Sequence, residues 1–334
     1  MKPVIFGLSG PTLTADEAAL FREADPLGYI LFGRNCVDRG QMRALTDALR
    51  DLSGRADVPI LIDQEGGRVA RMRAPEWPAF PAPAVFAGLY DRAPSSAIAA
   101  AKANGQAIGT MLAEVGVTVD ALPLLDVAQP DMTGAIGDRS YGADPMQVAA
   151  LGRATLDGLA AAGVVGIVKH MPGHGRARVD SHHELPRVDA SDAELAIDLQ
   201  PFVTLAHAPM AMTAHVVFSA WDADRPATLS PTVIREIIRE RIGFDGLLMT
   251  DDIDMKALSG TPAEKAAAAI AAGCDVVLDC WARMAEMTAI ADRLDAIAPK
   301  SRARLDQAMA GAGLGSEVPF AELVAKRDEL LALA

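Results

Sequence analysis

Eight short runs of aliphatic and β-branched residues recur along the chain, and longer stretches with a helical pattern separate them. Short apolar runs are typical of buried strands, and single strands that alternate with helices are typical of a parallel sheet. The predicted strands span residues 3–9, 28–33, 58–63, 119–127, 164–170, 210–218, 246–252 and 275–280. Eight such repeats in a chain of 334 residues predict an α/β fold in which the sheet closes into a (β/α)₈ TIM barrel.

The stretches between the strands carry local signals for helix ends. The clearest helical patterns span residues 38–52, 95–116, 144–163 and 230–243. Several open with Asp or Ser, which cap helix amino termini, and several close on Gly, which ends helices in a left-handed turn. Because no low-complexity linker divides the chain, we expect a single catalytic domain over residues 1–334, with helices from about residue 300 to 334 packed on the barrel.

An open, doubly wound sheet is the alternative architecture. Its dinucleotide-binding form carries the motif G-x-G-x-x-G between the first strand and the first helix. Residues 7–12 read GLSGPT, which does not match that motif. The closed barrel is therefore the better prediction.

The composition limits the partners of the chain. A hydrophobic fraction of 51% with only 4% aromatic residues suits a core of parallel strands covered by helices. The 44 acidic and 31 basic residues give a net charge of −13, which would repel nucleic acid and anionic lipid at long range. We expect neither nucleic acid nor a membrane as partner. The oligomeric state stays open, with a monomer favoured.

The cysteines and the apolar runs bear on the compartment. Cys36, Cys274 and Cys280 show no C-x-x-C spacing, and three is an odd number, which fits a reducing compartment better than a set of disulfides. The apolar run near the amino terminus is too short for a signal peptide, and no run approaches the roughly 20 residues that a membrane span needs. We expect a cytoplasmic protein.

Polar residues stand at the ends of the predicted strands or just past them. These residues are Asp63, Asp126, Lys169, His170, His215 and Asp251. In a (β/α)₈ barrel the carboxyl ends of the strands form the catalytic face. The candidate site residues therefore gather at the face where a barrel enzyme works.

Residues 169–186, KHMPGHGRARVDSHHELP, hold four of the six histidines. Histidine transfers protons near neutral pH and also binds metals, so both functions are open. If the stretch around Asp180 is extended, Asp180 and His182 project to the same side, and the carboxylate can hydrogen-bond the imidazole. His183 would then project to the other side, into solvent. We interpret Asp180 and His182 as an oriented proton carrier.

The two glycines Gly173 and Gly175 stand ahead of this pair. They predict a mobile loop that brings a catalytic group to the substrate.

A metal-dependent barrel hydrolase is the competing interpretation of the histidine-rich stretch. It lacks an H-x-H motif on the first strand, and a Pro-Gly loop rather than a helical face separates His170 from His174. We expect no metal site.

Residues 61–73, LIDQEGGRVARMR, bring carboxylates and guanidinium groups around the pair Gly66 and Gly67. These charged residues are Asp63, Glu65, Arg68 and Arg71. The stretch is either a surface cluster of ion pairs or a polar pocket in which Asp accepts from, and Arg donates to, vicinal hydroxyls of a sugar.

Asp251 is the first polar residue past Thr250 at a strand end. A carboxylate nucleophile with a separate proton carrier is the equipment of a retaining glycosidase.

Five motifs together point to a known family. DQEGGRVAR, GDRSYG, KHMPGHG, DSH and MTDDIDM resemble, in order and spacing, the β-N-acetylhexosaminidases of glycoside hydrolase family 3. The resemblance implies a retaining hydrolase, without cofactor, that releases terminal β-linked N-acetylglucosamine in the cytoplasm from muropeptides carrying 1,6-anhydro-N-acetylmuramic acid. It implies Asp251 as nucleophile and His182, held by Asp180, as acid and base. The implied sugar-binding residues are Asp63, Arg71, Arg139, Lys169 and His170.

The chain departs from the family pattern at two places. Met171 stands where the family usually has Phe, and residues 278–284, LDCWARM, stand where a Cys-Asn pair is common. Trp281 in this segment would alter the wall on the leaving-group side.

Two other functions stay open beside hydrolysis. A phosphorylase is compatible with a histidine acid, because a phosphate anion is not repelled by it as it would be by a carboxylate. A non-catalytic sugar sensor would keep Asp63, Arg71 and Lys169 but could lose Asp251 or His182, and this chain has both.

Overall fold

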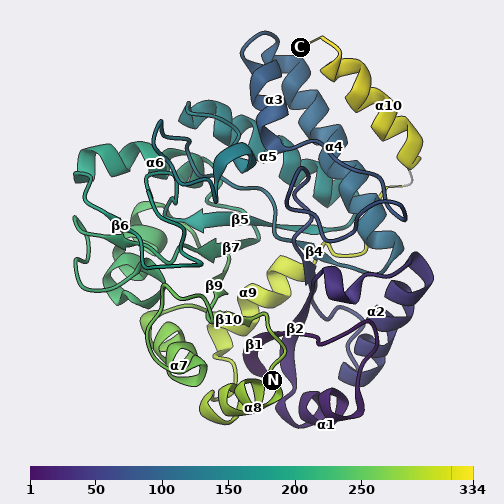
Figure 1. Ribbon diagram of the computed structural model, residues 1–334, viewed down its shortest axis with the longest axis vertical. Helices are drawn as coiled ribbons and strands as arrows, with labels where there is room; N and C mark the ends of the chain where they lie inside the picture. The colour runs from purple at the N-terminus through teal and green to yellow at the C-terminus, as the bar shows by residue number, and fades with distance from the viewer. Residues whose placement is uncertain (317, 334) are drawn as a thin grey trace.

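The strands close into a barrel, as the alternation of strands and helices predicts (Figure 1). The computed structural model describes residues 1–316 and 318–333, and within these residues eight parallel strands pair in chain order, with the last beside the first. The barrel strands are β1 (Lys2–Gly7), β2 (Pro26–Leu31), β3 (Ile60–Ile62), β4 (Val119–Asp120), β5 (Val165–Met171), β7 (Met210–Thr213), β9 (Leu247–Asp252) and β10 (Val276–Asp279). Each of the predicted strand segments contributes one of them.

Helices follow the strands on the outside of the barrel (Figure 1). The α-helices are α1 (Ala15–Ala24), α2 (Arg39–Ser53), α3 (Pro83–Tyr90), α4 (Pro94–Glu114), α5 (Pro145–Ala161), α6 (Asp192–Thr204), α7 (Pro262–Ala272), α8 (Met284–Arg293), α9 (Pro299–Met309) and α10 (Phe320–Leu331). The other helical segments are η1 (Gly33–Asn35), η2 (Gly137–Arg139), η3 (Ala227–Leu229) and the π-helix η4 (Val233–Arg241). Across the described residues, every helix is too short or too polar to cross a bilayer.

Capping residues set the helix ends close to the predicted positions. The Asp38 side chain accepts a hydrogen bond from a backbone N–H in the first turn of α2, and Gly54 ends that helix with a φ of +64°. The Asp144 side chain accepts from two backbone N–H groups in the first turn of α5. Residues close in sequence therefore define the ends of these helices.

The two longest predicted strands differ most from the observed ones. The predicted strand 119–127 ends at Asp120, because Pro123 has no N–H to continue the ladder. The predicted strand 210–218 divides into β7 and β8 (Val217–Phe218). The N–H of Val217 donates to the carbonyl of Pro186 at 2.9 Å, so β8 pairs outside the barrel with β6 (Arg187–Val188). This small sheet fixes the far end of the histidine-rich segment.

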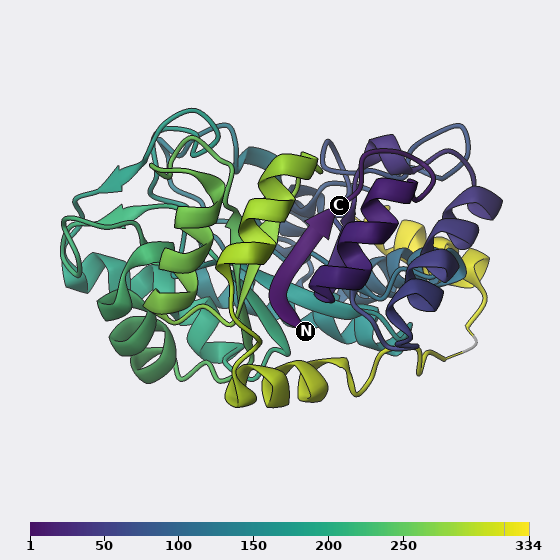
Figure 2. The same ribbon diagram turned by 90° about the horizontal axis from the view of Figure 1, so that it is seen from below.

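The core has two layers, because alternate side chains of each strand face opposite sides of the sheet. The interior of the barrel is filled by the inward residues, among them Ile5, Ile30, Leu61, Val119, Ile167 and Leu278. Leu305 and Met309 of α9 join this interior cluster, and α9 lies across the end of the barrel where β1 begins (Figure 2). The polar residues lie at the opposite end of the barrel, where the strands finish.

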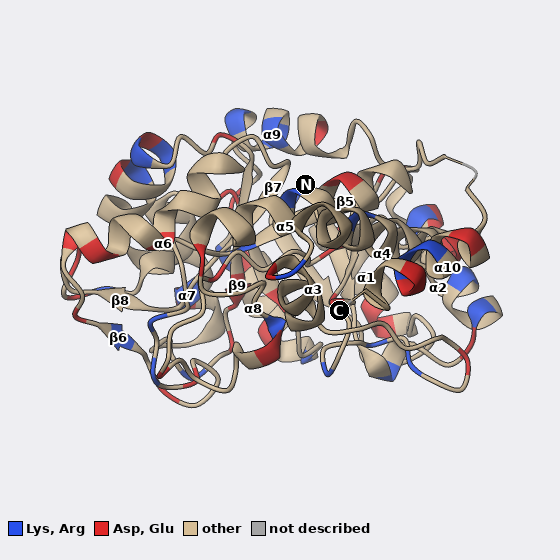
Figure 3. Ribbon diagram, turned by 90° about the horizontal axis from the view of Figure 1, so that it is seen from above, with Lys and Arg blue, Asp and Glu red and all other residues tan. Residues whose placement is uncertain are grey.

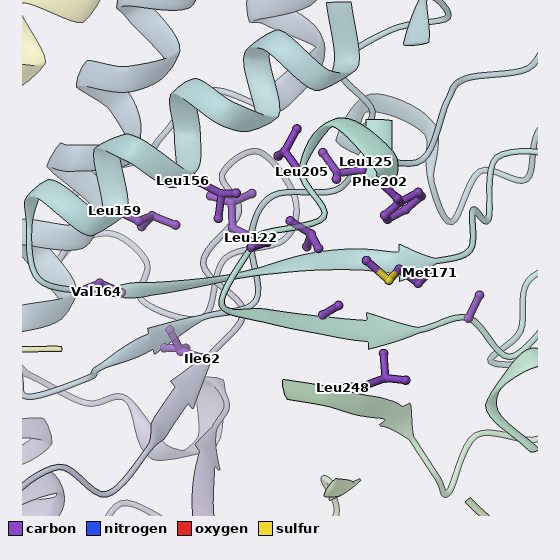
Figure 4. Close-up of a cluster of buried hydrophobic side chains, with 14 of the residues drawn as sticks. Ile62, Leu122, Leu125, Leu156, Leu159, Val164, Met171, Phe202, Leu205 and Leu248 are labelled. Atoms are coloured by element: carbon purple, nitrogen blue, oxygen red, sulfur yellow. The ribbon is translucent and has the colours of Figure 1, made fainter. Parts of the chain in front are cut away.

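The outer layer lies between the strands and the helices. Figure 4 shows this layer around β5, with Leu156 and Leu159 of α5 pointing toward the strand and Met171 at its far end. Met171 is fully buried, so this departure from the family pattern lies in the core.

Helix α10 packs beside α4 (Figure 1). The Arg327 guanidinium donates to the side-chain oxygen of Asn104 at 3.2 Å and lies over the ring of Phe80 at 5.6 Å. Acidic and basic residues are interspersed on the outer helices (Figure 3). On α9, for example, Arg302 donates to Asp306 at 2.7 Å, an exposed ion pair of the kind that contributes little to stability.

Candidate active site

A cavity of about 270 Å³ opens at the carboxyl ends of the barrel strands. Its lining consists of Ile30, Phe32, Arg34, Asp63, Arg71, His182, Met212, Asp251, Asp252, Leu278, Cys280 and Trp281. Four of the predicted site residues are in this lining: Asp63 and Arg71 from the loop after β3, His182 from the histidine-rich loop and Asp251 from β9. Of the other four, Lys169 pairs with Asp63, His170 lies beside Asp251 and Asp180 binds His182. Arg139 is linked to Lys169 through Glu65, which both bind. The structure thus brings all the predicted site residues into one connected cluster.

A buried network of charges lies beside the cavity. The ammonium group of Lys169 is 2.7 Å from Glu65 Oε1 and 3.2 Å from Asp63 Oδ1. Arg139 donates two hydrogen bonds of 2.8 Å to the two oxygens of Glu65, and Arg71 donates to Asp63 Oδ2 at 3.0 Å. Each buried charge has an opposite charge within hydrogen-bond distance, which offsets the cost of removing it from water.

These contacts set the protonation of the network. Burial alone would raise the pKa of Asp63, but the charges of Lys169 and Arg71 outweigh it and hold that pKa well below its usual range. The carboxylates of Glu65 and Asp63 likewise hold the pKa of Lys169 above its usual value, although burial opposes them. Asp63 and Lys169 are therefore both charged at neutral pH and present an acceptor and a donor of hydrogen bonds.

His170 lies between two carboxylates. Its Nδ1 donates to Asp126 Oδ2 at 2.8 Å, and its Nε2 is 4.0 Å from Asp251 Oδ2. Asp126 is fully buried, and its other oxygen accepts the backbone N–H groups of His170 at 3.2 Å and His174 at 2.6 Å. Because Nδ1 carries a proton toward Asp126, a second proton on Nε2 would face Asp251. Asp126 thus fixes the orientation of His170 toward Asp251.

Lys169 and His170 are neighbours in β5, yet both side chains belong to the site. Regular alternation would turn one of them away from the mouth. The pairing of β5 with β7 is irregular between Val168 and Met171, which brackets the two residues. This local irregularity is where the strand departs from simple alternation.

Asp251 lies near the end of β9, after the apolar residues of the strand. Burial would raise its pKa, but His170, His215 and the N–H of Asp252 outweigh burial and hold the pKa below the usual value. That N–H donates to Asp251 Oδ1 at 2.8 Å. His215 Nε2 in turn donates to the carbonyl of Asp252 at 3.0 Å, while its Nδ1 is 2.7 Å from Thr228 Oγ1. Asp251 is therefore an ionised carboxylate on a rigidly held backbone.

The segment around Asp180 differs from the prediction. It is a turn rather than an extended strand, because the N–H groups of His183 and Glu184 donate back to the Asp180 carbonyl at 2.9 and 3.2 Å. Asp180 Oδ1 accepts both the N–H of His182, at 2.9 Å, and its ring Nδ1, at 2.8 Å. Asp side chains form such turns readily by binding the backbone two residues ahead. The predicted contact between Asp180 and His182 is present, but the turn produces it.

The other histidines of the loop have different surroundings. His183 is exposed, as predicted. His174 is buried beside His170, and its Nε2 is 3.3 Å from Ser181 Oγ. Burial and the neighbouring His170 lower the pKa of His174 to about 4, so it is neutral at pH 7. His182 alone in this loop lines the cavity.

Several residues of the site escaped the sequence prediction or were only noted in it. Glu65 and Asp126 are buried partners of predicted residues, and Asp252 and Trp281 line the cavity. Arg68 lies outside, where it pairs with Asp138 at the surface at 2.9 Å. A buried carboxylate that binds a predicted histidine has no local motif, but its place at a strand end is the signal that would find it.

Within the described part of the chain, no three His, Cys, Asp or Glu side chains are grouped so that they could hold a metal ion. Each buried histidine of the site already has protein partners. His170 binds Asp126, and His215 binds Thr228 and the Asp252 carbonyl.

Sequence and structure comparisons agree on the family. The glycosyl hydrolase family 3 N-terminal domain matches residues 13–310. A β-hexosaminidase of Alkalilimnicola ehrlichii is 40% identical over 283 residues, which cover 83% of this chain and 80% of the relative. A β-hexosaminidase of Bordetella pertussis is 38% identical and covers 85% of this chain and 81% of the relative.

The structure of NagZ from Neisseria gonorrhoeae in complex with N-trifluoroacetyl-D-glucosamine is similar to this chain with a TM-score of 0.87 and 30% identity. The similarity covers 100% of this chain and 98% of NagZ. Together with the barrel and the polar cluster at its mouth, these matches place the chain: it belongs to glycosyl hydrolase family 3 and is a glycoside hydrolase.

Proposed function

We propose that this enzyme releases terminal β-linked N-acetylglucosamine, with retention of configuration, from muropeptides that carry 1,6-anhydro-N-acetylmuramic acid. The names of its relatives, β-hexosaminidase and NagZ, support the sugar that is released. We place the reaction in the cytoplasm, in keeping with the free thiols of Cys36, Cys274 and Cys280, all within the described part of the chain. One observation carries the proposal: the ionised Asp251 and the Asp180–His182 pair meet at one cavity.

Asp251 is the proposed nucleophile. Its carboxylate attacks the anomeric carbon, the bond to the leaving oxygen breaks, and a glycosyl ester forms. A nucleophile must be ionised, and the lowered pKa of Asp251 meets that need. The N–H of Asp252 holds one carboxylate oxygen, so the other is free to attack.

His182 is the proposed acid and base. As an imidazolium it gives its Nε2 proton to the leaving oxygen in the first step, and as a neutral imidazole it takes a proton from the attacking water in the second. Asp180 accepts from Nδ1 and stabilises the imidazolium by its charge. Burial alone would raise the pKa of Asp180, but the hydrogen bonds from His182 outweigh burial and lower that pKa below its usual value, which keeps Asp180 ionised.

The charged network is the proposed sugar-binding surface. Asp63 accepts from sugar hydroxyls, while Arg71, Lys169 and His170 donate to them. Arg139 also belongs to this surface, and its guanidinium is bound to Glu65. The fixed geometry of these ion pairs holds the ring so that the anomeric carbon faces Asp251.

The stereochemistry of the first product tests this proposal. Proton NMR during hydrolysis of an aryl β-N-acetylglucosaminide should show the β-anomer of N-acetylglucosamine first, with the α-anomer appearing later by mutarotation. Direct formation of the α-anomer would contradict a nucleophilic Asp251.

Phosphorolysis is a second candidate. Arg34 and Arg71 are among the residues that line the cavity, and an imidazole acid does not repel phosphate. Turnover with and without phosphate, with sugar 1-phosphate as the analysed product, separates the two reactions. The hydrolase proposal predicts free N-acetylglucosamine in both conditions.

A further inference from the structure

Trp281 stands at the rim of the catalytic cavity. It follows β10 and lines the same cavity as Asp251 and His182, yet 55% of it is exposed. Large aromatic side chains dominate the energetics of binding surfaces because they bury much area with little loss of side-chain freedom. An exposed indole at this place is therefore a candidate for ligand contact.

Two interactions hold the indole in one orientation. Its Nε1 donates to Asp252 Oδ2 at 2.9 Å, and the Arg283 guanidinium lies 5.5 Å from the ring centroid. Between the two side chains, Ala282 has a φ of +56°, in the left-handed region that non-glycine residues seldom adopt. Arg283 covers one side of the ring and is itself held by Asp254 at 3.1 Å. The indole is therefore placed before a ligand arrives, which reduces the entropy cost of binding.

The same hydrogen bonds link the indole to the proposed nucleophile. Asp252 accepts from Trp281 through its side chain and donates to Asp251 through its N–H. Burial raises the pKa of Asp252 to about 6, so its side chain is ionised at neutral pH and accepts well from an N–H. The indole thus has a defined position relative to Asp251.

The size of the cavity indicates what the indole would contact. A volume of about 270 Å³ lies below the roughly 300–1,000 Å³ that is typical of pockets for drug-sized ligands. One sugar ring at Asp251 would occupy it, and the leaving group would project to the rim. The exposed part of Trp281 lies at that rim.

We propose that Trp281 forms a stacking platform for a sugar ring in the leaving group, and that it makes the enzyme prefer ring-shaped leaving groups. This inference rests on the proposed glycosidase function. The apolar C–H face of a pyranose ring covers the free face of the indole, and the hydroxyls at the ring edge stay in water. An open-chain polyol offers no such face.

A matched pair of substrates tests the platform. N,N′-diacetylchitobiose and its borohydride-reduced alditol share the leaving oxygen and nearly all atoms, but only the former has a ring beyond the scissile bond. For the wild type we expect a higher kcat/KM with the ring form. Trp281→Ala should lower kcat/KM for the ring form by about tenfold, mainly through KM, and change that for the alditol by less than about threefold. Trp281→Phe, which keeps an aromatic face, should restore most of the preference.

The outcomes separate the two proposals. Equal losses on both substrates in Trp281→Ala, or no preference for the ring form in the wild type, would overturn the platform and leave the glycosidase proposal standing. If the wild type hydrolysed neither substrate nor an aryl N-acetylglucosaminide, the proposed function would fail and this inference with it.

Discussion

The two sides of the catalytic cavity are built in different ways. Beside the barrel, Lys169, Glu65 and Asp126 are buried, and each is bound by two residues from distant parts of the chain. On the loop, the His182 side chain is 64% exposed, and its ring is bound by Asp180, two residues away. Long-range contacts fix the groups that would hold the sugar and attack it, whereas a local turn holds the proposed proton carrier.

This difference suits the proposed division of labour. A nucleophile and sugar-binding groups need a fixed geometry, because small displacements cost rate. A proton carrier that serves entering substrate and leaving product can sit on a segment that moves. The contrast predicts that substitutions on the buried side act on every substrate, while those on the loop depend on the leaving group.

The largest effect should follow Asp251→Ala. We expect turnover of an activated aryl N-acetylglucosaminide to fall more than about a thousandfold, which corresponds to ~4 kcal/mol in barrier height. Circular dichroism and thermal unfolding of the variant should remain close to wild type. Residual activity above that limit would remove Asp251 from the role of nucleophile.

His182→Ala should separate the two sides most clearly. With a poor leaving group, such as a sugar alcohol, the first step should slow by about 10²–10⁴, since the leaving oxygen needs a proton. With a nitrophenolate the first step should slow less than about tenfold. Asp180→Asn should act in the same direction but less, because it keeps a hydrogen bond and removes the charge. Equal losses with both leaving groups would remove His182 from the role of acid and leave His170 as the candidate, since His174 is buried and neutral at pH 7.

Asp126→Asn probes the buried side without changing the proposed nucleophile itself. Without the charge of Asp126, His170 loses the partner that fixes its Nδ1 proton and its direction toward Asp251. We expect kcat/KM to fall about tenfold to a hundredfold, by the same factor for good and poor leaving groups. A loss that appeared only with poor leaving groups would place Asp126 with the loop. Unchanged thermal unfolding would separate this positioning role from a loss of fold.

The smallest effect on activity, and a distinct one on stability, should follow Asp279→Asn. In the described structure neither carboxylate oxygen of Asp279 has a hydrogen-bond partner, and burial followed by the nearby Asp252 raises its pKa to about 7. The native state therefore keeps a proton that the unfolded state loses near pH 4, so wild-type stability should fall as pH rises from about 4 to 7. At pH 7.5 the free energy of unfolding of the variant should exceed that of the wild type by at most about a few kcal/mol. Near pH 4 the two proteins should be equally stable. Denaturant unfolding at both pH values measures this, and a difference that does not change with pH would show that folding does not raise the pKa of Asp279.

The fold follows from the sequence to a large extent, because its signals are local. Strand runs and capping residues such as Asp38 and Asp144 act within a few positions. The exceptions have identifiable causes: Pro123 interrupts a ladder, and residues 217–218 pair with a short strand that no periodicity reveals. Whether residues 1–334 act as one domain, and as a monomer, stays a prediction.

Less of the site than of the fold could be predicted from the sequence. The positions of Asp63, Lys169, His170 and Asp251 at strand ends were predictable, because a barrel gathers strand ends at one face. The bonds of Glu65 and Asp126 were not, since they join residues tens of positions apart. The Asp180–His182 contact was predicted from strand alternation, but a side chain that binds its own backbone overrides that alternation. The mobility of this loop and the role of each residue stay predictions.

Trapping of the glycosyl-enzyme tests the central claim most directly. In His182→Ala an aryl N-acetylglucosaminide should still glycosylate the enzyme, while the loss of the base should slow hydrolysis of the ester. Intact-protein mass spectrometry should then show one added N-acetylglucosaminyl residue, and peptide mapping should locate it on Asp251. Added azide should discharge the ester as the β-glycosyl azide. An adduct on another residue, or no adduct during demonstrable turnover of the variant, would contradict the account.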